Sequence, residues 1–149
     1  MTIEEAIEQK RPFSDEYQRC MVNLIFTTNS VQSIVKKHLK DYGITLQQYN
    51  VLRILKGAGK PISTSVIRKR LLDKMSDTSR IVERLVQKNL ADRLVCSKDK
   101  RLVDVSISIE GLKLLDRINL QNIEVRDWFG KLGKEEVHYL NQLLDKIRM

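Results

Sequence analysis

Residues 76–111 read SDTSRIVERLVQKNLADRLVCSKDKRLVDVSISIEG, and this stretch decides the fold. It begins with a predicted helix that opens at Ser76 or Asp77, both good N-cap residues. Asn89 is suited to end this helix because asparagine tolerates the left-handed backbone conformation. The helix has one apolar face, with residues three to four positions apart. These residues are Ile81, Val82, Leu85 and Val86.

Two short strands follow this helix. Residues 94–96 are a β-prone run, and residues 103–107 alternate apolar and polar side chains as a half-buried strand does. Residues 97–101 between them are polar and mostly basic. This pattern predicts a β-hairpin with a charged tip.

A shorter helix precedes the segment. Ser63 is placed to cap it, and Ile62 and Ile67 have the spacing of a hydrophobic staple. A turn around Asp73 and Lys74 would join this helix to the next one. Two short helices joined by a tight turn predict a helix-turn-helix.

A further helix before the helix-turn-helix has a strong start signal. Thr45 and Gln48 form a T-x-x-Q capping box, and Ile44 and Tyr49 flank it as a staple. A cluster of glycine and proline at residues 57–61 marks the end of this helix.

Long helices are predicted at both ends of the chain. After a polar N-terminal tail, Ser14 can cap a helix of about 28 residues that stops at Gly43. A helix capped by Ser108 runs towards Trp128, and a last helix follows Gly133. A central domain of about 60 residues could not cover all their apolar side chains. We therefore expect these helices to pack on each other and on a second copy of the chain.

The composition is typical of a single folded domain rich in helix. The 149 residues are 42% hydrophobic and 31% charged, with six glycines and two prolines, which excludes collagen-like, low-complexity and disordered chains. Two cysteines are too few for a disulfide framework. The sequence has neither an apolar stretch of membrane-spanning length nor the apolar core of a signal peptide. We therefore expect a cytoplasmic protein with no membrane contact.

No motif in the sequence predicts catalysis. The sequence contains no glycine-rich phosphate loop, no H-E-x-x-H and no G-x-S-x-G. His38 and His138 lie on separate predicted helices, and the cysteines and histidines lack metal-ligand spacing. We expect no enzyme activity, no cofactor and no metal site.

The net charge of +8 is concentrated in the middle of the chain. Residues 60–101 contain 12 basic and 5 acidic side chains, a net charge of +7, while the flanking parts are nearly neutral. A local excess of this kind is what binding to a polyanion requires. The alternative is a solvated basic face that only keeps the protein soluble. The excess coincides with the predicted helix-turn-helix and hairpin.

Two motifs in the same region match a family pattern. Residues 99–111, DKRLVDVSISIEG, follow D-x-R, three variable residues, V-x-[LI]-[ST] and a glycine three residues later. Residues 79–85, SRIVERL, match a recognition-helix pattern that usually begins with threonine. Together with the order of the elements, these motifs make the chain similar to the MarR family of bacterial transcriptional regulators, from about residue 14 to the end. Asn89 stands where that family often has glycine.

The resemblance implies a mainly α fold with a small β-hairpin, in which a winged helix-turn-helix is embedded in a helical dimerisation domain of about six helices. A single domain would span residues 1–149. The winged helix-turn-helix would occupy residues 45–107, and the dimerisation helices residues 1–44 and 108–149.

DNA contacts are predicted at three places. A helix N-terminus rich in hydroxyls and arginine suits the major groove, where Arg80 or Arg84 could pair with guanine. The alternative is that one of these arginines bonds only a phosphate or the neighbouring Glu83. The resemblance implies that the hairpin lies along the flanking minor groove. The hydroxyls of the preceding helix could hold phosphates or only cap the helix. The predicted DNA-contacting residues are Ser76, Thr78, Ser79, Arg80 and Arg84 in the recognition helix, Ser63, Thr64, Ser65 and Arg68 in the helix before it, and Lys98, Lys100 and Arg101 in the hairpin loop.

The resemblance also implies a signal that releases DNA. Family members commonly bind small, often phenolic, anions between the dimerisation helices and the winged helix. His38, Tyr42, Tyr49 and Arg53 could line such a cleft, although ordinary packing also explains the tyrosines. A redox subgroup uses a cysteine near the start of the first long helix, where Cys20 lies. Its position on the apolar face also fits an inert core thiol.

The sequence thus predicts a homodimeric, sequence-specific DNA-binding transcriptional regulator, and more finely a repressor that a small effector releases. Twofold symmetry predicts an inverted-repeat operator with half-sites roughly 10–10.5 base pairs apart. Two alternatives stay open: a thiol-based redox sensor acting through Cys20, and a winged-helix protein-interaction scaffold without specific DNA binding.

Overall fold

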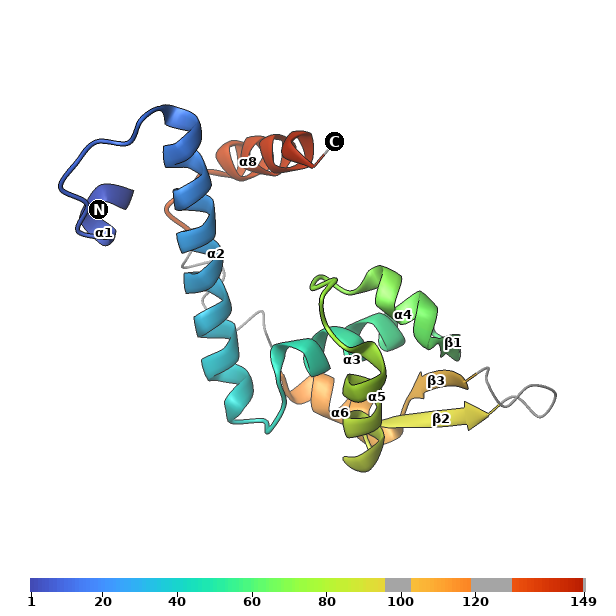
Figure 1. Ribbon diagram of the computed structural model, residues 1–149. Coiled ribbons are helices and arrows are strands. Elements are labelled where there is room, and N and C mark those ends of the chain that lie inside the picture. The colour runs from blue at the N-terminus through green and yellow to red at the C-terminus, as the bar shows by residue number, and fades with distance from the viewer. Residues whose placement is uncertain (96–102, 119–129, 149) are drawn as a thin grey trace.

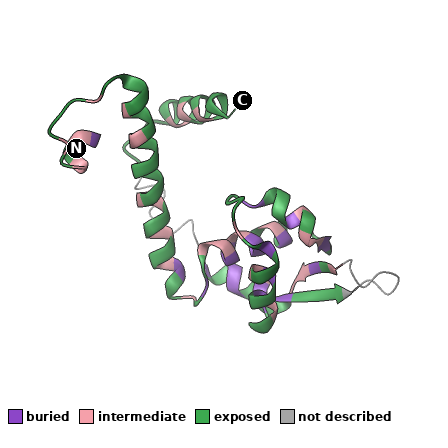
Figure 2. Ribbon diagram, in the orientation of Figure 1, coloured by how far each residue is buried: buried purple, intermediate pink, exposed green. Residues whose placement is uncertain are grey.

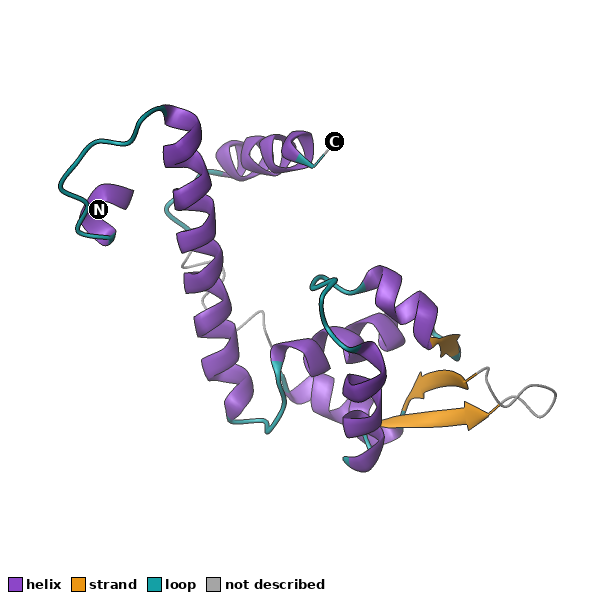
Figure 3. Cartoon of the chain, viewed as in Figure 1, coloured by secondary structure: helices purple, strands orange, loops and turns teal. Residues whose placement is uncertain are grey.

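Helices make up most of the protein, and a small sheet lies at one end (Figure 1, Figure 3). The computed structural model describes residues 1–95, 103–118 and 130–148. Within these ranges no helix is long and apolar enough to cross a membrane. The helices are α1 (Ile3–Ala6), α2 (Glu16–Lys40), α3 (Leu46–Ala58), α4 (Thr64–Arg70), α5 (Thr78–Gln87), α6 (Ile109–Arg117) and α8 (Lys134–Ile147), and the strands are β1 (Ile62–Ser63), β2 (Ala91–Val95) and β3 (Val103–Ile107).

The sheet is antiparallel and has the order β1-β3-β2. β2 pairs with β3 along its whole length, from Ala91 opposite Ile107 to Val95 opposite Val103. The predicted mainly helical fold with a hairpin is therefore confirmed, although β2 begins at Ala91 and not at Leu94. β1 was not predicted, because two residues are too few to show an alternating pattern.

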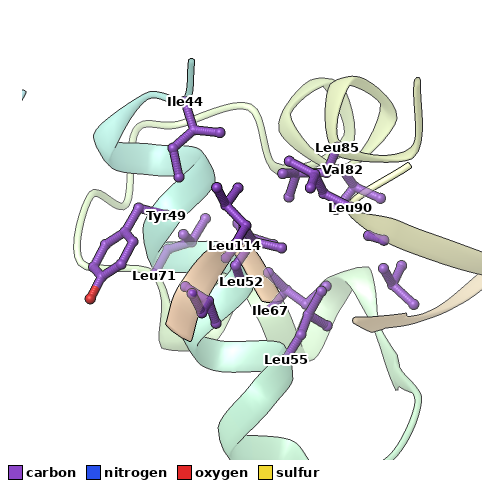
Figure 4. Packing of buried hydrophobic residues seen from close by; sticks show 14 of the residues in the cluster. Ile44, Tyr49, Leu52, Leu55, Ile67, Leu71, Val82, Leu85, Leu90 and Leu114 are labelled. Carbon is purple, nitrogen blue, oxygen red and sulfur yellow. The ribbon is translucent and has the colours of Figure 1, made fainter. Parts of the chain in front are cut away.

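The hydrophobic core joins α3, α4, α5 and α6 to the sheet. Leu52 and Leu55 on α3 belong to the same cluster as Val82 and Leu85 on α5, and all four side chains are fully buried (Figure 4). Leu39, in the last turn of α2, is also fully buried in this cluster. The C-terminal end of the long helix α2 is therefore packed into the hydrophobic core.

Most helix starts follow the predicted caps. Thr45 Oγ1 accepts a hydrogen bond from the Gln48 backbone N–H at 3.2 Å, and the Thr45 backbone N–H donates to Gln48 Oε1 at 3.1 Å, which confirms the capping box. The cap of α2 was predicted wrongly. Asp15, and not Ser14, is the N-cap, because its carboxylate accepts two backbone N–H bonds at 2.8 Å. These bonds, chiefly the one from Gln18, lower the pKa of Asp15.

The helix predicted to run from Ser108 towards Trp128 is shorter than expected. Ser108 is the N-cap of α6 as predicted, and its Oγ accepts the Gly111 backbone N–H at 3.0 Å. α6 ends at Arg117 because Ile118 leaves the helical conformation, with ψ 80°. The remainder of the predicted helix, residues 119–129, lies outside the described residues.

The polar N-terminal tail contains the short helix α1. Thr2 and Glu5 form a capping box at its start. The Arg19 guanidinium on α2 donates to the Glu4 carboxylate at 2.6 Å, and this bond lowers the pKa of Glu4 from 4.5 to about 2. The ion pair ties α1 to the beginning of α2, an attachment that the apolar pattern of the tail did not indicate.

The N-terminal part of α2 and the helix α8 lie at the end of the molecule away from the sheet, where few residues are buried (Figure 1, Figure 2). α8 has no buried residue. Both helices carry large apolar side chains that the described part of the chain leaves exposed. These are Tyr17, Met21, Leu24, Ile25 and Phe26 on α2 and Tyr139, Leu143 and Ile147 on α8.

Candidate nucleic-acid interface

The helix α5 has an apolar inner face and a polar outer face. Val82 and Leu85 are fully buried in the core, whereas Ser79, Arg80 and Arg84 are exposed. Arg80 and Arg84 are four residues apart, so their side chains project from the same side of the helix. The outer face of α5 therefore presents two guanidinium groups and a hydroxyl to solvent.

The start of α5 is held by a network of side-chain caps. Of the two predicted N-caps, Asp77 is the one observed, and its Oδ1 accepts the Arg80 backbone N–H at 3.1 Å. The Ser76 hydroxyl donates to Asp73 Oδ2 at 2.7 Å, and this bond lowers the pKa of Asp73. Ser76 is half-buried, so its hydroxyl braces the turn before the helix in addition to its predicted role at DNA.

A hollow of about 290 Å³ lies between the start of α3 and the start of α5. Arg80 and Arg84 line it together with the carboxylate of Asp77, so cations outnumber anions around it. Gln47 also lines it. No sequence pattern indicated this residue, because the packing of α3 against α5 brings together parts of the chain that are far apart in sequence. The full lining is Thr45, Gln47, Gln48, Ser76, Asp77, Arg80, Ile81 and Arg84.

The predicted contact residues of α4 divide into caps and exposed groups. Ser63 Oγ accepts the Val66 backbone N–H at 3.4 Å, so Ser63 is the N-cap of α4. The Ser63 and Ser65 hydroxyls are hydrogen bonded at 2.8 Å. Thr64 is half-buried, and Ser65 and Arg68 are exposed. Capping thus accounts for Ser63, while Ser65 and Arg68 are accessible to a phosphate.

Thr78 was predicted to contact DNA, and its side chain is almost fully buried in the structure, being only 6% exposed. Its hydroxyl has no hydrogen-bond partner among the described residues. Thr78 lies one turn before Val82 and therefore on the inner face of α5. Within the described chain this side chain faces inward, and its contact with DNA stays a prediction.

The junctions at the base of the hairpin are tightly packed. Asn89 has φ 57° and ends α5 in the left-handed conformation, as predicted. The Ser108 hydroxyl donates to the Asn89 carbonyl at 2.7 Å. A Cβ on Gly111 would lie 2.2 Å from the Leu90 carbonyl oxygen. The glycine of the sequence motif thus allows α6 to pack directly against the backbone that leads into β2.

The four predicted effector residues lie outside the hollow beside α5 and outside a second hollow of the described chain. The rings of His38 and Tyr42 are adjacent, with centroids 5.2 Å apart, and the Tyr42 hydroxyl donates to the Arg117 carbonyl at 3.2 Å. Tyr49 is buried, which raises its pKa. Arg53 is exposed. Packing and a helix-end hydrogen bond therefore account for both tyrosines in the described chain.

A larger hollow of about 510 Å³ lies instead where α2 meets α3. Lys36 and Lys40 are one turn apart on α2 and contribute two cations to its wall. The other lining residues are Gly43, Ile44, Thr45, Leu46 and Gln47.

Two further predicted sites have different outcomes. Cys20 is exposed, contrary to the buried position expected for a core thiol, because the N-terminal part of α2 extends beyond the core of the described chain. The hairpin-loop residues Lys98, Lys100 and Arg101 lie outside the described residues, so their contacts stay predictions.

Similarity to known proteins agrees with this architecture. A sequence model of the MarR family matches residues 42–102, a range that contains α3, α4, α5 and β2. The structure is similar to that of a mutant MarR from E. coli complexed with operator DNA, with a TM-score of 0.74 and 26% identity, covering 84% of this chain and 91% of that one. The chain is therefore similar to proteins of the MarR family in the sequence of residues 42–102 and in fold.

Two curated proteins that are similar to this chain are transcriptional regulators by name. The chain is 24% identical over 121 residues to the HTH-type transcriptional regulator PecS of Dickeya dadantii, covering 78% of this chain and 72% of PecS. It is 35% identical over 81 residues to the HTH-type transcriptional repressor MdtR of Bacillus subtilis. That match covers 54% of this chain and 52% of MdtR, about half of each.

Proposed function

We propose that this protein is a homodimeric transcriptional repressor of the MarR family that binds an inverted-repeat DNA operator. The observation that carries the proposal is the outer face of α5, where Arg80 and Arg84 are exposed one turn apart beside a positively charged hollow. The net charge of +7 on residues 60–101 supports it. So does the similar E. coli protein, whose structure contains operator DNA, and the name of MdtR as a repressor.

The exposed groups divide into base-reading and phosphate-binding roles. Arg80 and Arg84 enter the major groove with α5, where a bidentate pair with guanine is worth about 1–3 kcal/mol of discrimination. Ser79, Ser65 and Arg68 bind phosphates, which position the helix without reading sequence. Lys98, Lys100 and Arg101 of the hairpin loop bind along the minor groove.

The second copy of the chain covers the exposed apolar side chains of α2 and α8. These include Leu24, Ile25 and Phe26, which lie far from the winged-helix core and favour burial against an equivalent face. A Leu24→Glu variant is expected to shift the protein from dimer to monomer in analytical ultracentrifugation. An unchanged sedimentation coefficient at the same concentration would place the dimer contact elsewhere.

Salt dependence tests the DNA-binding proposal directly. The affinity for random duplex DNA, measured by fluorescence anisotropy, should fall with salt, with a log–log slope of about −0.9 per phosphate contact. The absence of binding at low salt, or a slope near zero, would instead favour a protein-interaction scaffold with a basic face that serves only solubility.

Recognition of specific DNA bases by the protein is tested with the operator that in-vitro selection yields. Arg84→Ala is expected to weaken operator binding more than random-DNA binding, because a base contact is lost. Lys113→Ala removes the same charge from α6, where Lys113 pairs with Glu110 at 2.8 Å, and serves as the matched control. Equal losses on operator and random DNA would assign Arg84 to a phosphate. Selection without an inverted repeat would contradict the symmetric dimer.

The hollow between α2 and α3 supports release by a small anionic or phenolic effector. Lys36 and Lys40 provide positive charge, and Ile44 and Leu46 provide apolar surface. A hydroxybenzoate probe should raise the melting temperature of the protein and weaken operator binding, because a ligand that binds the folded state stabilises it. Lys36→Met combined with Lys40→Met should remove both effects. If the double variant responds like the wild type, the effector binds elsewhere.

A further inference from the structure

The recognition helix α5 is tied at its C-terminal end to the corner between α2 and α3. Lys88 Nζ donates to the Gly43 backbone carbonyl at 2.5 Å and to Gln48 Oε1 at 3.4 Å. Gly43 lies in the corner and has φ 68°, a conformation that favours glycine. One lysine therefore connects the end of α5 with the point at which the chain leaves the long helix α2 for the winged helix.

This corner is itself fixed to the core. Leu39 on one side of it and Ile44 on the other are 0% and 6% exposed. Between them, the Tyr42 hydroxyl donates to the Arg117 carbonyl at the end of α6, at 3.2 Å. Since two buried side chains and a hydrogen bond hold the corner, α2 projects from the winged helix at a defined angle.

The other end of α5 is attached to α3 as well. Asn50 Oδ1 on α3 accepts the Leu72 backbone N–H at 3.1 Å, in the turn that leads to α5. Asp77 then caps the first turn of the helix. α5 is thus held before its first residue through Asn50 and just beyond its last residue through Lys88. Only the Lys88 attachment reaches the corner from which α2 departs.

The Lys88 ammonium is engaged by protein acceptors, which distinguishes it from the cations on the outer face of α5. A lysine has three donors, and two of them are directed to Gly43 and Gln48. Arg80 and Arg84 make no side-chain hydrogen bond or ion pair with the described part of the chain. Lys88 is exposed, but its ammonium is already bonded to protein acceptors, so its geometry suits a brace between two segments better than a phosphate contact.

We propose that Lys88 is a positioning residue that sets the angle between α5 and α2, and through α2 the distance between the two recognition helices of the dimer. The inference rests on the proposed function, because it requires a dimer bound to two half-sites. Each base pair added between half-sites moves the second one by about 3.4 Å and rotates it by about 35°. A braced joint accepts one spacing, whereas a loose joint accepts several.

The test compares the binding of variants to three operators that differ only in half-site spacing and to one duplex with a single half-site. Three duplexes carry the half-sites selected by the wild type, with the selected spacing and with one base pair fewer or more, and a fourth carries one half-site. The wild type is expected to bind the selected spacing about tenfold or more tightly than the other two, because a displaced half-site loses its base contacts. Lys88→Met should reduce this preference to about threefold or less, since it keeps the side-chain stem but loses the ammonium. Lys88→Arg should restore it.

A second variant separates the effect of loosening the corner between α2 and α3 from the effect of losing a positive charge. Tyr42→Phe removes the hydroxyl bond to the Arg117 carbonyl without changing the net charge, and it should also weaken the spacing preference. Lys113→Met, which changes the charge by the same amount as Lys88→Met, should leave the preference unchanged.

The outcomes distinguish the inference from the proposed function. If Lys88→Met weakens binding to all four duplexes by one common factor, Lys88 is a DNA cation or a general stabiliser, and the inference is wrong. The inference is also overturned if Lys88→Met keeps the full spacing preference, whatever the result with Tyr42→Phe. If the wild type binds none of the duplexes, the proposed function itself fails.

Discussion

Replacing Gly111 with alanine is expected to destabilise the protein by about 2 kcal/mol, although alanine is the better helix former by about 1 kcal/mol. The new Cβ would lie 2.2 Å from the Leu90 carbonyl oxygen and 2.8 Å from Ile107 Cγ1. The first of these contacts is with backbone, so relief requires α6 to move away from the hairpin. Overpacking costs typically about 1–3 kcal/mol. A backbone clash places Gly111→Ala at the upper end of that range, and the gain in helix propensity offsets about one third of the cost.

Urea unfolding followed by circular dichroism measures this effect, at one fixed protein concentration because a dimer's stability depends on concentration. Gly57→Ala in α3 is the matched control, since its Cβ would meet no atom within 4 Å, and it should stabilise the protein by about 0.5–1 kcal/mol. A Gly111→Ala protein as stable as the wild type would refute the close packing of α6 on Leu90.

Three other substitutions test the core, a cap and an ion pair. Leu52→Ala, at a fully buried site, should cost about 2–5 kcal/mol in the same urea assay. Thr45→Ala, which removes the bond to the Gln48 N–H, should cost about 1 kcal/mol, and no loss would mean that the cap is dispensable. Glu4→Gln should speed amide exchange in α1. Because hydrogen bonds, chiefly the one from Arg19, lower the pKa of Glu4 from 4.5 to about 2, the difference from wild type should be complete above about pH 5, shrink as the pH falls and disappear below about pH 2. A difference that stays constant over this range would exclude the ion pair as its cause.

The elements that the sequence predicted well are those whose signals are local. The capping box at Thr45 and the left-handed Asn89 both depend on neighbouring residues, and both occur as predicted. The same kind of local signal indicates where the Thr78 side chain lies. Thr78 is spaced one turn before Val82, which assigns its side chain to the inner face of α5.

Other features depend on contacts between distant parts of the chain. The apolar periodicity of α2 identified the face that carries Cys20, but it could not show that the core of the described chain ends near Leu39 and leaves Cys20 exposed. Gln47 lines the hollow beside α5 only because α3 packs against that helix. The brace between Lys88 and Gly43 spans 45 residues, and no pattern in the sequence pairs them.

The strand order β1-β3-β2 places a short strand at each edge of the sheet. β1 has only two residues and follows Pro61, which lacks a backbone N–H, and β2 carries the exposed charges of Asp92 and Arg93. Short edges, proline and charge all discourage the addition of a foreign strand. The sheet edges therefore offer a poor template for sheet growth, which disfavours aggregation through them.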